Sequence, residues 1–580
     1  MDCVVAVKPS TVAGPNAPPH FFRSQMTDLI IINADVWTMD NDAPRAEAIA
    51  IQGNRISAVG PSKDIKALAN DDTRVIDAQG NTVLPGFIDS HVHLFQGSAE
   101  LDFLPVGGIK DLELVRPKVL DYAASRPDEP LILGVGAFYD LFIGQDKAPR
   151  LLLDEIISDR PFALLAADLH TVWANTLTLE KAGLLFGAEV PEGSTVVMGD
   201  DGMANGVLLE TGAFGPALAL SRTGGRDMLG YVTGSDPVPP ATPEEREADK
   251  DLLCKGLAHV AKHGITTLHN MDGNFYQLEL LSELEAEGRL TARVQIPYHF
   301  KNYDPLERLE EAAEMHARYQ GGKVWSGRVK MFMDGVLESR TGLKTRAYPD
   351  DPKNHGEAVF DPGHFNEACR IADAMGLQIS VHAVGDLAVK RVLDGYEYAR
   401  EKNGPRDARH RIEHIELITE EDLDRMKRLD VVASMQPRHA VFAGFFDPPA
   451  PNTVFYEDEC KLAFAWRSIR EKGIPVAFST DWPVVPVHVL ENIQCAIAPK
   501  NLGPEWPDQS QSLEETIESY TAANAAVAFK EHQLGCLQTG MAGDVVMLNG
   551  SLENTGKEKI GSMGIAMTIA DGEVVYASNV

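Results

Sequence analysis

The chain has 580 residues, and its 53 Lys and Arg against 85 Asp and Glu give a formal net charge of −32. One hydrophobic core rarely grows to serve such a length, so we expect several domains or an α/β barrel that carries insertions. The strong negative charge argues against a nucleic acid or an anionic membrane surface as partner.

The cysteines and the hydropathy pattern favour a cytoplasmic protein. The six cysteines are far apart and form no CxxC pair, so neither a thiolate zinc site nor a disulfide framework is expected. No apolar run approaches the roughly 18 residues that cross a bilayer. The apolar stretch from Val4 to Val7 is too short for the core of a signal peptide.

Both ends of the chain show a β-rich pattern. Residues 1–26 contain scattered prolines without periodicity, which predicts either a flexible extension or a misplaced start, with Met26 as the alternative first residue. Short apolar strands follow, and Gly53-Asn54 and Gly80-Asn81 suit the turns of antiparallel hairpins. The last part of the chain repeats this pattern around Asp571-Gly572. We therefore predict one β-sandwich domain built from residues 27–84 and 538–580.

Residues 85–537 show short apolar strands that alternate with amphipathic helices, as in a parallel sheet with helical crossovers. Eight such strands predict a (β/α)8 TIM barrel, whose chemistry lies at the carboxyl ends of its strands. The predicted strands are residues 87–93, 265–271, 293–300, 328–334, 378–384, 411–416, 431–436 and 476–481, and the predicted helices include 276–287, 306–319, 365–375, 388–401 and 420–429.

The first two predicted strands are separated by about 170 residues, where a barrel ordinarily uses about 30. We therefore predict an insertion over residues 100–262, with strands of its own at 131–136 and 162–167. An insertion after the first strand emerges at the catalytic end of a barrel. It is expected to act as a lid that shapes the substrate pocket.

Polar side chains collect at the carboxyl ends of the predicted strands. His91 and His93 share one face of the first strand, because side chains alternate along a strand. Each polar residue alone also fits a structural role, as a satisfied core histidine, a snorkelling lysine or a capping aspartate. Together they predict a site for zinc or a related divalent ion. The predicted ligands are His91, His93, Lys330, His382, His414 and Asp481.

These residues lie in motifs that resemble the amidohydrolase superfamily, in particular its amidohydrolase 3 or YtcJ-like branch, which includes enzymes that deformylate N-substituted formamides. The resemblance covers residues 27–580 and is less specific for substrate than for the superfamily. The Asn270-Met271-Asp272 run departs from the usual pattern and leaves any role for His269 or Asp272 open. The motifs include Leu84-Pro-Gly-Phe-Ile-Asp-Ser-His-Val-His93, Val381-His-Ala-Val-Gly-Asp386, Ile412-Glu-His414 and Ser479-Thr-Asp-Trp-Pro483.

The resemblance implies two divalent ions, most readily zinc, bridged by a carboxylated Lys330. His91, His93 and Asp481 would hold one ion, and His382 and His414 the other; a single ion with Lys330 as an amine is the alternative. Asp481, Lys330 and His382 would be catalytic, with Asp481 carrying the proton from a metal-activated hydroxide to the leaving nitrogen. A small-molecule substrate is implied, and dimerisation is common in the family.

Three classes of function remain open. The first is hydrolysis of a carbon–nitrogen bond in an amide, an N-substituted formamide or a cyclic amide. The second is deamination of an amino-heterocycle on the same metal site. The third is a regulatory or binding protein without catalysis, against which the complete ligand set argues. Candidates for substrate contacts, which equally fit roles in a local core or on the surface, are His170, Trp173, Asn175, Arg340 and Trp482.

Overall fold

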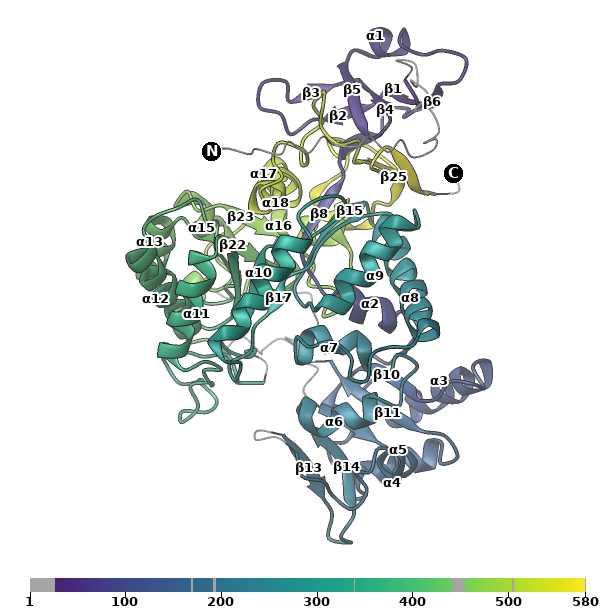
Figure 1. Ribbon diagram of the computed structural model, residues 1–580, viewed down its shortest axis with the longest axis vertical. Helices are drawn as coiled ribbons and strands as arrows, with labels where there is room; N and C mark the ends of the chain where they lie inside the picture. The colour runs from purple at the N-terminus through teal and green to yellow at the C-terminus, as the bar shows by residue number, and fades with distance from the viewer. Residues whose placement is uncertain are drawn as a thin grey trace, which may run out of the picture.

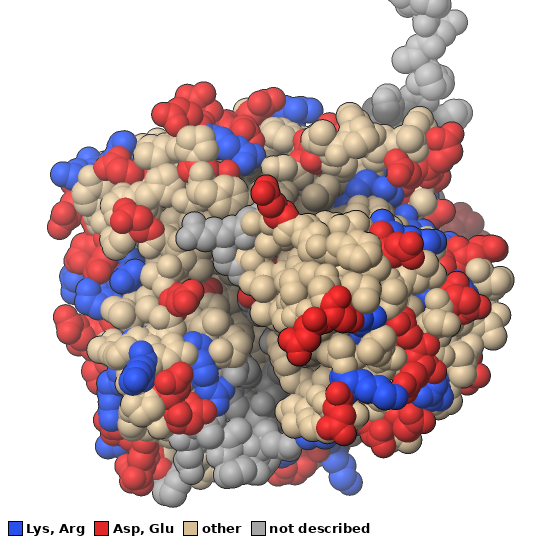
Figure 2. Space-filling model, turned by 90° about the horizontal axis from the view of Figure 1, so that it is seen from below, with Lys and Arg blue, Asp and Glu red and all other residues tan. Residues whose placement is uncertain are grey.

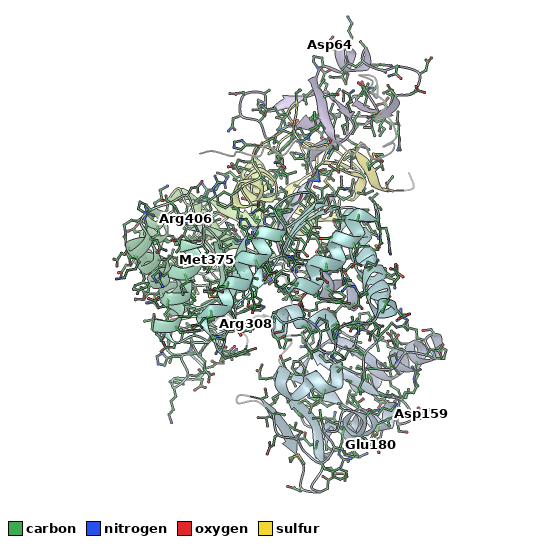
Figure 3. All side chains as sticks on the ribbon, in the orientation of Figure 1. Asp64, Asp159, Glu180, Arg308, Met375 and Arg406 are labelled. Carbon is green, nitrogen blue, oxygen red and sulfur yellow. The ribbon has the colours of Figure 1, made fainter. Side chains whose placement is uncertain are left out.

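The structure, a computed structural model, describes residues 27–167, 171–190, 194–337, 339–440, 454–502 and 505–578. The predicted N-terminal extension, residues 1–26, lies outside the described residues. Strands from both ends of the chain lie at one end of the long axis, the parallel strands lie in the middle, and the insertion lies at the other end (Figure 1). Asp64 marks the first end, and Asp159 and Glu180 mark the last (Figure 3).

The middle of the molecule confirms the α/β class. Its strands pair in parallel and are buried on both faces, as β20 shows with every residue buried, so their sequences read as continuous apolar runs. All eight predicted strands are present, and each begins within one residue of the prediction. The strands are β8 (Phe87–Val92), β15 (Ile265–Asn270), β16 (Arg293–Gln295), β17 (Tyr298–His299), β18 (Val324–Trp325), β19 (Arg328–Phe332), β20 (Gln378–Ala383), β21 (Arg411–His414), β22 (Val432–Met435) and β23 (Val476–Phe478). The third predicted strand is divided into β16 and β17, and a further short strand, β18, was not predicted.

Hydrogen bonding divides these strands between two sheets, in the orders β18-β16-β15-β8 and β17-β19-β20-β21-β22-β23. The closed barrel therefore remains a prediction. The predicted third strand is split into β16 and β17, one in each sheet. Pro297 lies between them, and proline has no N–H to donate to a ladder. A parallel bridge between Val92 and Trp482 links β8 to the segment that follows β23.

Helices follow most of these strands and bury one apolar face against them. In α12, Val389, Val392, Leu393 and Tyr396 are buried in the large core that also contains the strand residues. The five predicted helices are present, with the second divided into a short 3-10 turn and α10. The helices of this part are α9 (Phe275–Ala286), α10 (Leu309–Arg318), α11 (Pro362–Ala374), α12 (Asp386–Asn403), α13 (Glu420–Leu429), α15 (Trp466–Glu471), α16 (Val489–Ile497), α17 (Leu513–Tyr520) and α18 (Ala522–Val527).

The insertion forms a sheet of its own, in the order β13-β14-β12-β11-β10-β9. Neighbouring residues such as Leu164 and Leu165 point into two different apolar clusters, one on each face of this sheet. Its strands are β9 (Leu104–Pro105), β10 (Ile132–Ala137), β11 (Phe162–Ala166), β12 (Thr171–Ala174), β13 (Thr195–Met198) and β14 (Ala204–Leu209), and its helices are α3 (Leu112–Ser125), α4 (Pro149–Ile156), α5 (Thr176–Lys181), α6 (Thr211–Leu218), α7 (Arg226–Val232) and α8 (Pro243–Lys262). The short helix α2 (Leu94–Glu100) connects β8 to the insertion.

The two ends of the chain share a sheet. β24 pairs with β7 and with β25, which gives the order β26-β25-β24-β7-β2-β3; the other sheet is β5-β4-β1-β6. An apolar cluster that includes Ile31, Ile49, Val545 and Ile569 joins both sheets. The elements are β1 (Leu29–Ile32), β2 (Asp35–Trp37), β3 (Arg45–Ala46), β4 (Ala48–Gln52), β5 (Arg55–Gly60), α1 (Ser62–Lys66), β6 (Arg74–Asp77), β7 (Thr82–Pro85), β24 (Val545–Leu548), β25 (Ile565–Ala570) and β26 (Glu573–Ala577).

Two of the three predicted hairpins are confirmed, β4–β5 and β25–β26. The hairpin predicted around Gly80-Asn81 is wrong. β6 pairs in parallel with β1, whereas β7 pairs in parallel with β2 in the other sheet. Gln79 and Gly80 both have positive φ, at 53° and 84°, and the turn that they make carries the chain from one sheet to the other. This end is therefore not purely antiparallel.

On the face seen from the insertion end, charged side chains of one sign do not form a patch of their own. Acidic and basic side chains are interspersed there (Figure 2). Within the described ranges, no helix combines the length and apolarity needed to cross a membrane.

Candidate metal centre

The two histidines of the first parallel strand are held by carboxylates. Nδ1 of His91 lies 2.8 Å from Oε2 of Glu413, and Nδ1 of His93 lies 2.9 Å from Oδ1 of Asp272. A ring nitrogen that donates to a carboxylate leaves the other nitrogen as the lone-pair ligand. The two Nε2 atoms lie 3.4 and 3.5 Å from the same atom, Oδ1 of Asp481. Asp272, whose role the sequence leaves open, thus orients His93.

Asp481 follows β23 and joins two groups of ligand-type atoms. His91, His93 and Asp481 form the first, and His414, His439 and Asp481 form the second; the ligand atoms within each group lie within 4.8 Å of one another. Burial acts to raise the pKa of Asp481, but the neighbouring histidines outweigh it and hold that pKa well below its usual range. The carboxylate is therefore the anionic centre of the cluster.

His414 and His439 come from neighbouring strands. Nδ1 of His414 lies 2.8 Å from Oε1 of Gln436, which follows β22. His439 lies in the 3-10 turn after β22, with its ring stacked on that of His414 at 5.9 Å between centroids. His439 was not a predicted ligand, because it comes three residues after the end of the predicted strand 431–436 and not within it.

His382 and Lys330 are the remaining predicted ligands. The ring of His382 lies 4.5 Å from that of His414, between centroids, and its Nε2 lies 2.9 Å from the carbonyl oxygen of Gly335. Nζ of Lys330 is buried and has no hydrogen-bond partner among the described residues. It lies 4.5 Å from the centroid of the Phe332 ring. His91, His93, His382, His414 and Asp481 thus lie at or just after the carboxyl ends of the parallel strands, whereas Lys330 lies in the middle of β19.

The donor set fits a divalent ion. Two buried imidazole Nε2 atoms face one carboxylate oxygen, Oδ1 of Asp481, which is buried and accepts no hydrogen bond from the described residues. Imidazole nitrogen and carboxylate oxygen are ligands of zinc and related ions. A buried anionic oxygen without a partner is costly, so a cation at this position would satisfy it.

Two of the ligands have strained backbones. His414 has a φ of 77° and Asp481 a φ of 61°, a region that costs a non-glycine residue roughly 1–3 kcal/mol. At Asp481 the strain is maintained by backbone hydrogen bonds to β8 and the residue after it. The N–H of Asp481 donates to the carbonyl oxygen of His91 at 2.8 Å, and the N–H of His93 donates to the carbonyl oxygen of Trp482 at 2.8 Å. Strain of this kind is typical of functional sites.

A cavity of about 140 Å³ opens over the cluster. The insertion contributes Ala167 and Tyr231 to its wall, and α2 contributes Gln96. The ring of Tyr231, from α7, lies 5.3 Å from that of His93 between centroids. Sequence reasoning missed Tyr231, because a lone tyrosine in an insertion helix carries no motif. The other lining residues are His91, His93, Phe332, Asp334, Gly335, Val336, His382, Val384, His414, Glu416, His439, Asp481 and Val484.

The described substrate-contact candidates do not line this cavity. Trp173 packs in the insertion between Tyr139 and Phe142. Asn175 caps α5 and donates to two carbonyl oxygens of the insertion. Arg340 pairs with Asp350.

Trp482 is buried beside Gly97, where an added Cβ would meet its ring at 2.8 Å. His170 lies outside the described residues. Any contact of these five side chains with substrate stays a prediction.

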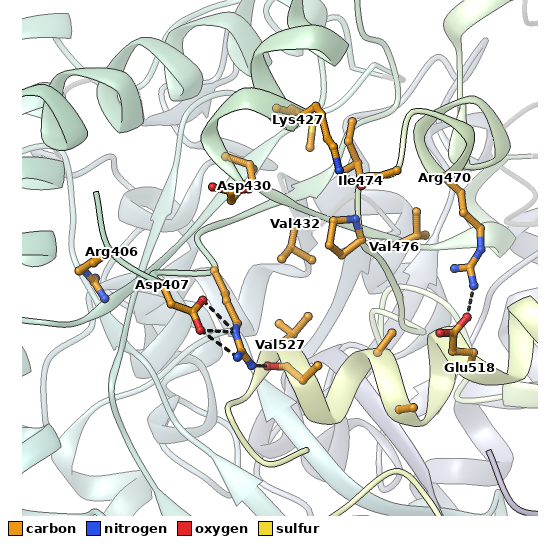
Figure 4. A pocket seen from close by; sticks show the side chains of 18 of the residues that line it. Arg406, Asp407, Lys427, Asp430, Val432, Arg470, Ile474, Val476, Glu518 and Val527 are labelled. Carbon is orange, nitrogen blue, oxygen red and sulfur yellow. Dashed lines mark hydrogen bonds and ion pairs between the residues drawn. The ribbon is translucent and has the colours of Figure 1, made fainter. Parts of the chain in front are cut away.

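A larger cavity, of about 790 Å³, lies at the other end of the strands, next to the amino ends of β22 and β23. Its charged groups pair with one another: Arg409 with Asp407, and Arg470 with Glu518 (Figure 4). In the described part of the chain, both clusters of metal-ligand type lie at the carboxyl end instead. The smaller cavity is therefore the candidate active site.

Comparison with known proteins agrees with this site. Residues 74–576 match the sequence model of the amidohydrolase 3 family. The YtcJ protein of Bacillus subtilis is 27% identical over 93% of this chain and 98% of its own length. The N-substituted formamide deformylase of Arthrobacter pascens is 25% identical over 95% of this chain and 99% of its own length.

Among solved structures, an uncharacterized metal-dependent hydrolase from Pyrococcus furiosus superposes with a TM-score of 0.69 and 26% identity, covering 92% of this chain and 100% of that one. The family match spans the described parallel strands and every member of the histidine and aspartate cluster. This chain therefore belongs to the amidohydrolase family, in its YtcJ-like branch, and is a hydrolase with a site for a divalent metal.

Proposed function

We propose that the chain hydrolyses the carbon–nitrogen bond of a small amide, an N-substituted formamide or a cyclic amide. The observation that carries this proposal is the triad of His91, His93 and Asp481, held by Glu413 and Asp272 at the base of a small cavity. Similarity to a formamide deformylase along nearly the whole chain supports the amide class.

A bound divalent ion would supply Lewis-acid activation of water and of a carbonyl group. The protein's own residues do the rest. Asp481, with its Oδ1 directed at the cluster, is placed to take a proton from the attacking water and return it to the leaving nitrogen. Water adds to the carbonyl carbon, the C–N bond breaks, and the amine leaves with the proton. Tyr231 and Phe332 exclude bulk water from one side of the cavity.

We further propose zinc as the metal, with a second ion bridged by Lys330 as its carbamate. Burial lowers the pKa of Lys330 to about 8. A lowered pKa raises the fraction of neutral amine near neutral pH, which is the form that adds to carbon dioxide with loss of a proton. The absence of a hydrogen-bond partner for Nζ among the described residues supports this role.

We also propose that the two parallel sheets are parts of one eight-stranded barrel and that the terminal sheets form a β-sandwich. The bridge between Val92 and Trp482 and the succession of β16 and β17 support the barrel. The apolar cluster shared by the terminal sheets supports the sandwich.

The experiment is a substrate screen on purified, metal-analysed enzyme. N-substituted formamides, acyl-amides, cyclic amides and amino-heterocycles are incubated with enzyme, and products are identified by mass spectrometry. Amine together with formate or another carboxylate is expected. Ammonia without a carboxylate would indicate deamination instead, and no product from metal-loaded enzyme would favour a protein without catalysis.

The variant Lys330→Ala tests the bridging role. Replacing Lys330 is expected to lower the metal content below that of the wild type and to abolish turnover. Full activity of this variant, or chelated enzyme that keeps its activity, would overturn the proposed metal chemistry.

A further inference from the structure

Three histidines gather outside the candidate metal centre, where α8 ends and α16 begins. His259 lies in the last turn of α8, His263 directly follows that helix, and His488 directly precedes α16. Residues four apart at the end of a helix lie on the same face. His263 is the middle member of the group: the centroid of its ring lies 5.0 Å from that of His259 and 4.4 Å from that of His488.

The spacing of these rings suits a shared metal ion. Two imidazoles on one ion have centroids about 4.5–5.3 Å apart, given metal–nitrogen bonds of about 2.0 Å and angles between octahedral and tetrahedral. The neighbouring histidine pairs of the candidate metal centre have centroids 4.5, 4.8 and 5.6 Å apart. The separations around His263 are therefore close to both ranges.

The three rings are neutral and their lone pairs are unused by the protein. No described residue forms a hydrogen bond or an ion pair with a ring nitrogen of His259, His263 or His488. Burial is the main cause that lowers the pKa of each ring, and it brings that of His263 to about 3. Near neutral pH each ring thus presents a free lone pair, which is the form that binds a metal.

An ion can reach the group from solvent. His263 and His488 line a cavity of about 370 Å³ between α8, α16 and the strands β25 and β26, and all three histidines are half-buried. As the rings are turned in the metal-free protein, their nitrogens do not all lie within 4.8 Å of one another. A half-turn about the Cβ–Cγ bond exchanges nitrogen with carbon and leaves the centroid in place, and no hydrogen bond to a described residue opposes it.

We propose that His259, His263 and His488 form a second metal site, which binds a divalent transition ion such as zinc and links the end of α8 to the start of α16. Imidazole is a preferred ligand of zinc, copper and nickel. Three histidines leave a fourth position, which water from the adjoining cavity can occupy. The ion would clip the last helix of the insertion to the helix that follows Asp481. This site goes beyond the proposed hydrolysis and does not depend on it.

The test is the zinc content of wild type and of the variant His263→Ala. Both proteins are loaded with zinc, freed of excess ion by gel filtration and measured by elemental mass spectrometry. The variant is expected to hold one zinc fewer than wild type, because it lacks the shared ligand. His259→Ala and His488→Ala should lose the same ion. Equal zinc contents in wild type and His263→Ala would overturn the site.

The matched control is His532→Ala, which removes an exposed histidine outside the group and should keep the zinc content of wild type. A loss of one zinc in this control as well would show unspecific binding to surface histidines and would also overturn the site.

Hydrogen exchange on wild-type protein locates the ion without any substitution. Adding zinc to metal-free protein should slow exchange in residues 257–263 and 488–494, in addition to the candidate metal centre. Protection confined to the candidate metal centre would contradict the proposal, even if the variants do not fold. Neither measurement uses a substrate, so failure of the proposed hydrolysis leaves both results valid.

Discussion

The chemistry of the site depends on which nitrogen of each histidine faces the centre, and buried partners decide this. Glu413 fixes His91 and is itself held by Arg411, whose Nε and Nη2 lie 2.6 and 2.8 Å from its two carboxylate oxygens. All three side chains are fully buried. The sequence located His91 by its motif, but it could not identify Glu413 as its partner, because the two residues are brought together only by the order of the strands.

Replacing Asp272 by Asn is expected to lower the affinity for a divalent metal about 10–100-fold, as for other residues that orient a ligand histidine. The amide keeps the size of the side chain but removes the negative charge that fixes Nδ1–H of His93. Competition with a chromogenic chelator measures the affinity. Asp350→Asn, which removes a carboxylate paired with Arg340 outside the cavity, is the control and should bind metal normally. Unchanged affinity in Asp272→Asn would contradict the assigned role.

Metal binding should also depend on pH. Burial acts to lower the pKa of His93, but its bond to Asp272 and the nearby carboxylate of Asp481 outweigh this and raise the pKa to about 9 in the metal-free protein. Below that pH an incoming ion must displace the proton, so the apparent affinity should rise with pH and level off above about 9. Zinc titrations of metal-free protein between about pH 6.5 and 9.5 measure this. An affinity that is flat with pH would exclude a protonated His93.

At the scale of elements, the prediction succeeded where a local pattern determines the structure. The buried apolar runs of the parallel part predicted all eight strands, and the polar residues at their ends include His91, His93, His414 and Asp481, which cluster in the structure. It failed where partners are distant. Gly80-Asn81 looks like a hairpin turn, but β6 and β7 belong to different sheets. α7, which brings Tyr231 to the cavity, has no sequence signature because its position is set by contacts with α8 and β17.

The anchoring of α7 can be tested at Arg226. Nε and Nη2 of Arg226 bind both oxygens of the buried Asp249 on α8, at 2.7 and 3.0 Å. Arg226→Ala leaves that carboxylate without its cation, which typically costs about 3–5 kcal/mol. Urea unfolding should show the loss, and hydrogen exchange in residues 226–232 should speed up.

Arg289→Ala is the matched control for Arg226→Ala. Arg289 also pairs with carboxylates of α8, Glu247 and Asp251, but its side chain is 31% exposed. A loss of at most about 1 kcal/mol is expected, because water screens exposed ion pairs. Equal losses in the two variants would mean that α7 is not held by the buried pair.

At the scale of the whole molecule, the terminal sheets and the parallel strands are built around the same segment. β7 runs directly into β8, which carries His91, while β24 from the other end of the chain pairs with β7. Arg293 of β16 pairs with Asp544 and Asp571 across this boundary. The sequence predicted that both ends of the chain combine, because both have the same hairpin pattern. It could not predict this boundary, which consists of contacts between residues about 250 or more positions apart.

The boundary should make the terminal sheets and the parallel strands unfold together. Val546 is fully buried there, and an added Cβ on Gly264 would lie 2.8 Å from its Cγ2. Val546→Ala removes two methyl groups and leaves a cavity, for a loss of about 2 kcal/mol. Val574→Ala in the half-exposed strand β26 should cost less than about 1 kcal/mol.

Hydrogen exchange under increasing urea, followed separately in residues 29–60 and 378–414, should show one shared midpoint that Val546→Ala shifts equally in both segments. Two midpoints, or a shift confined to residues 29–60, would show that the terminal sheets are an independent folding unit.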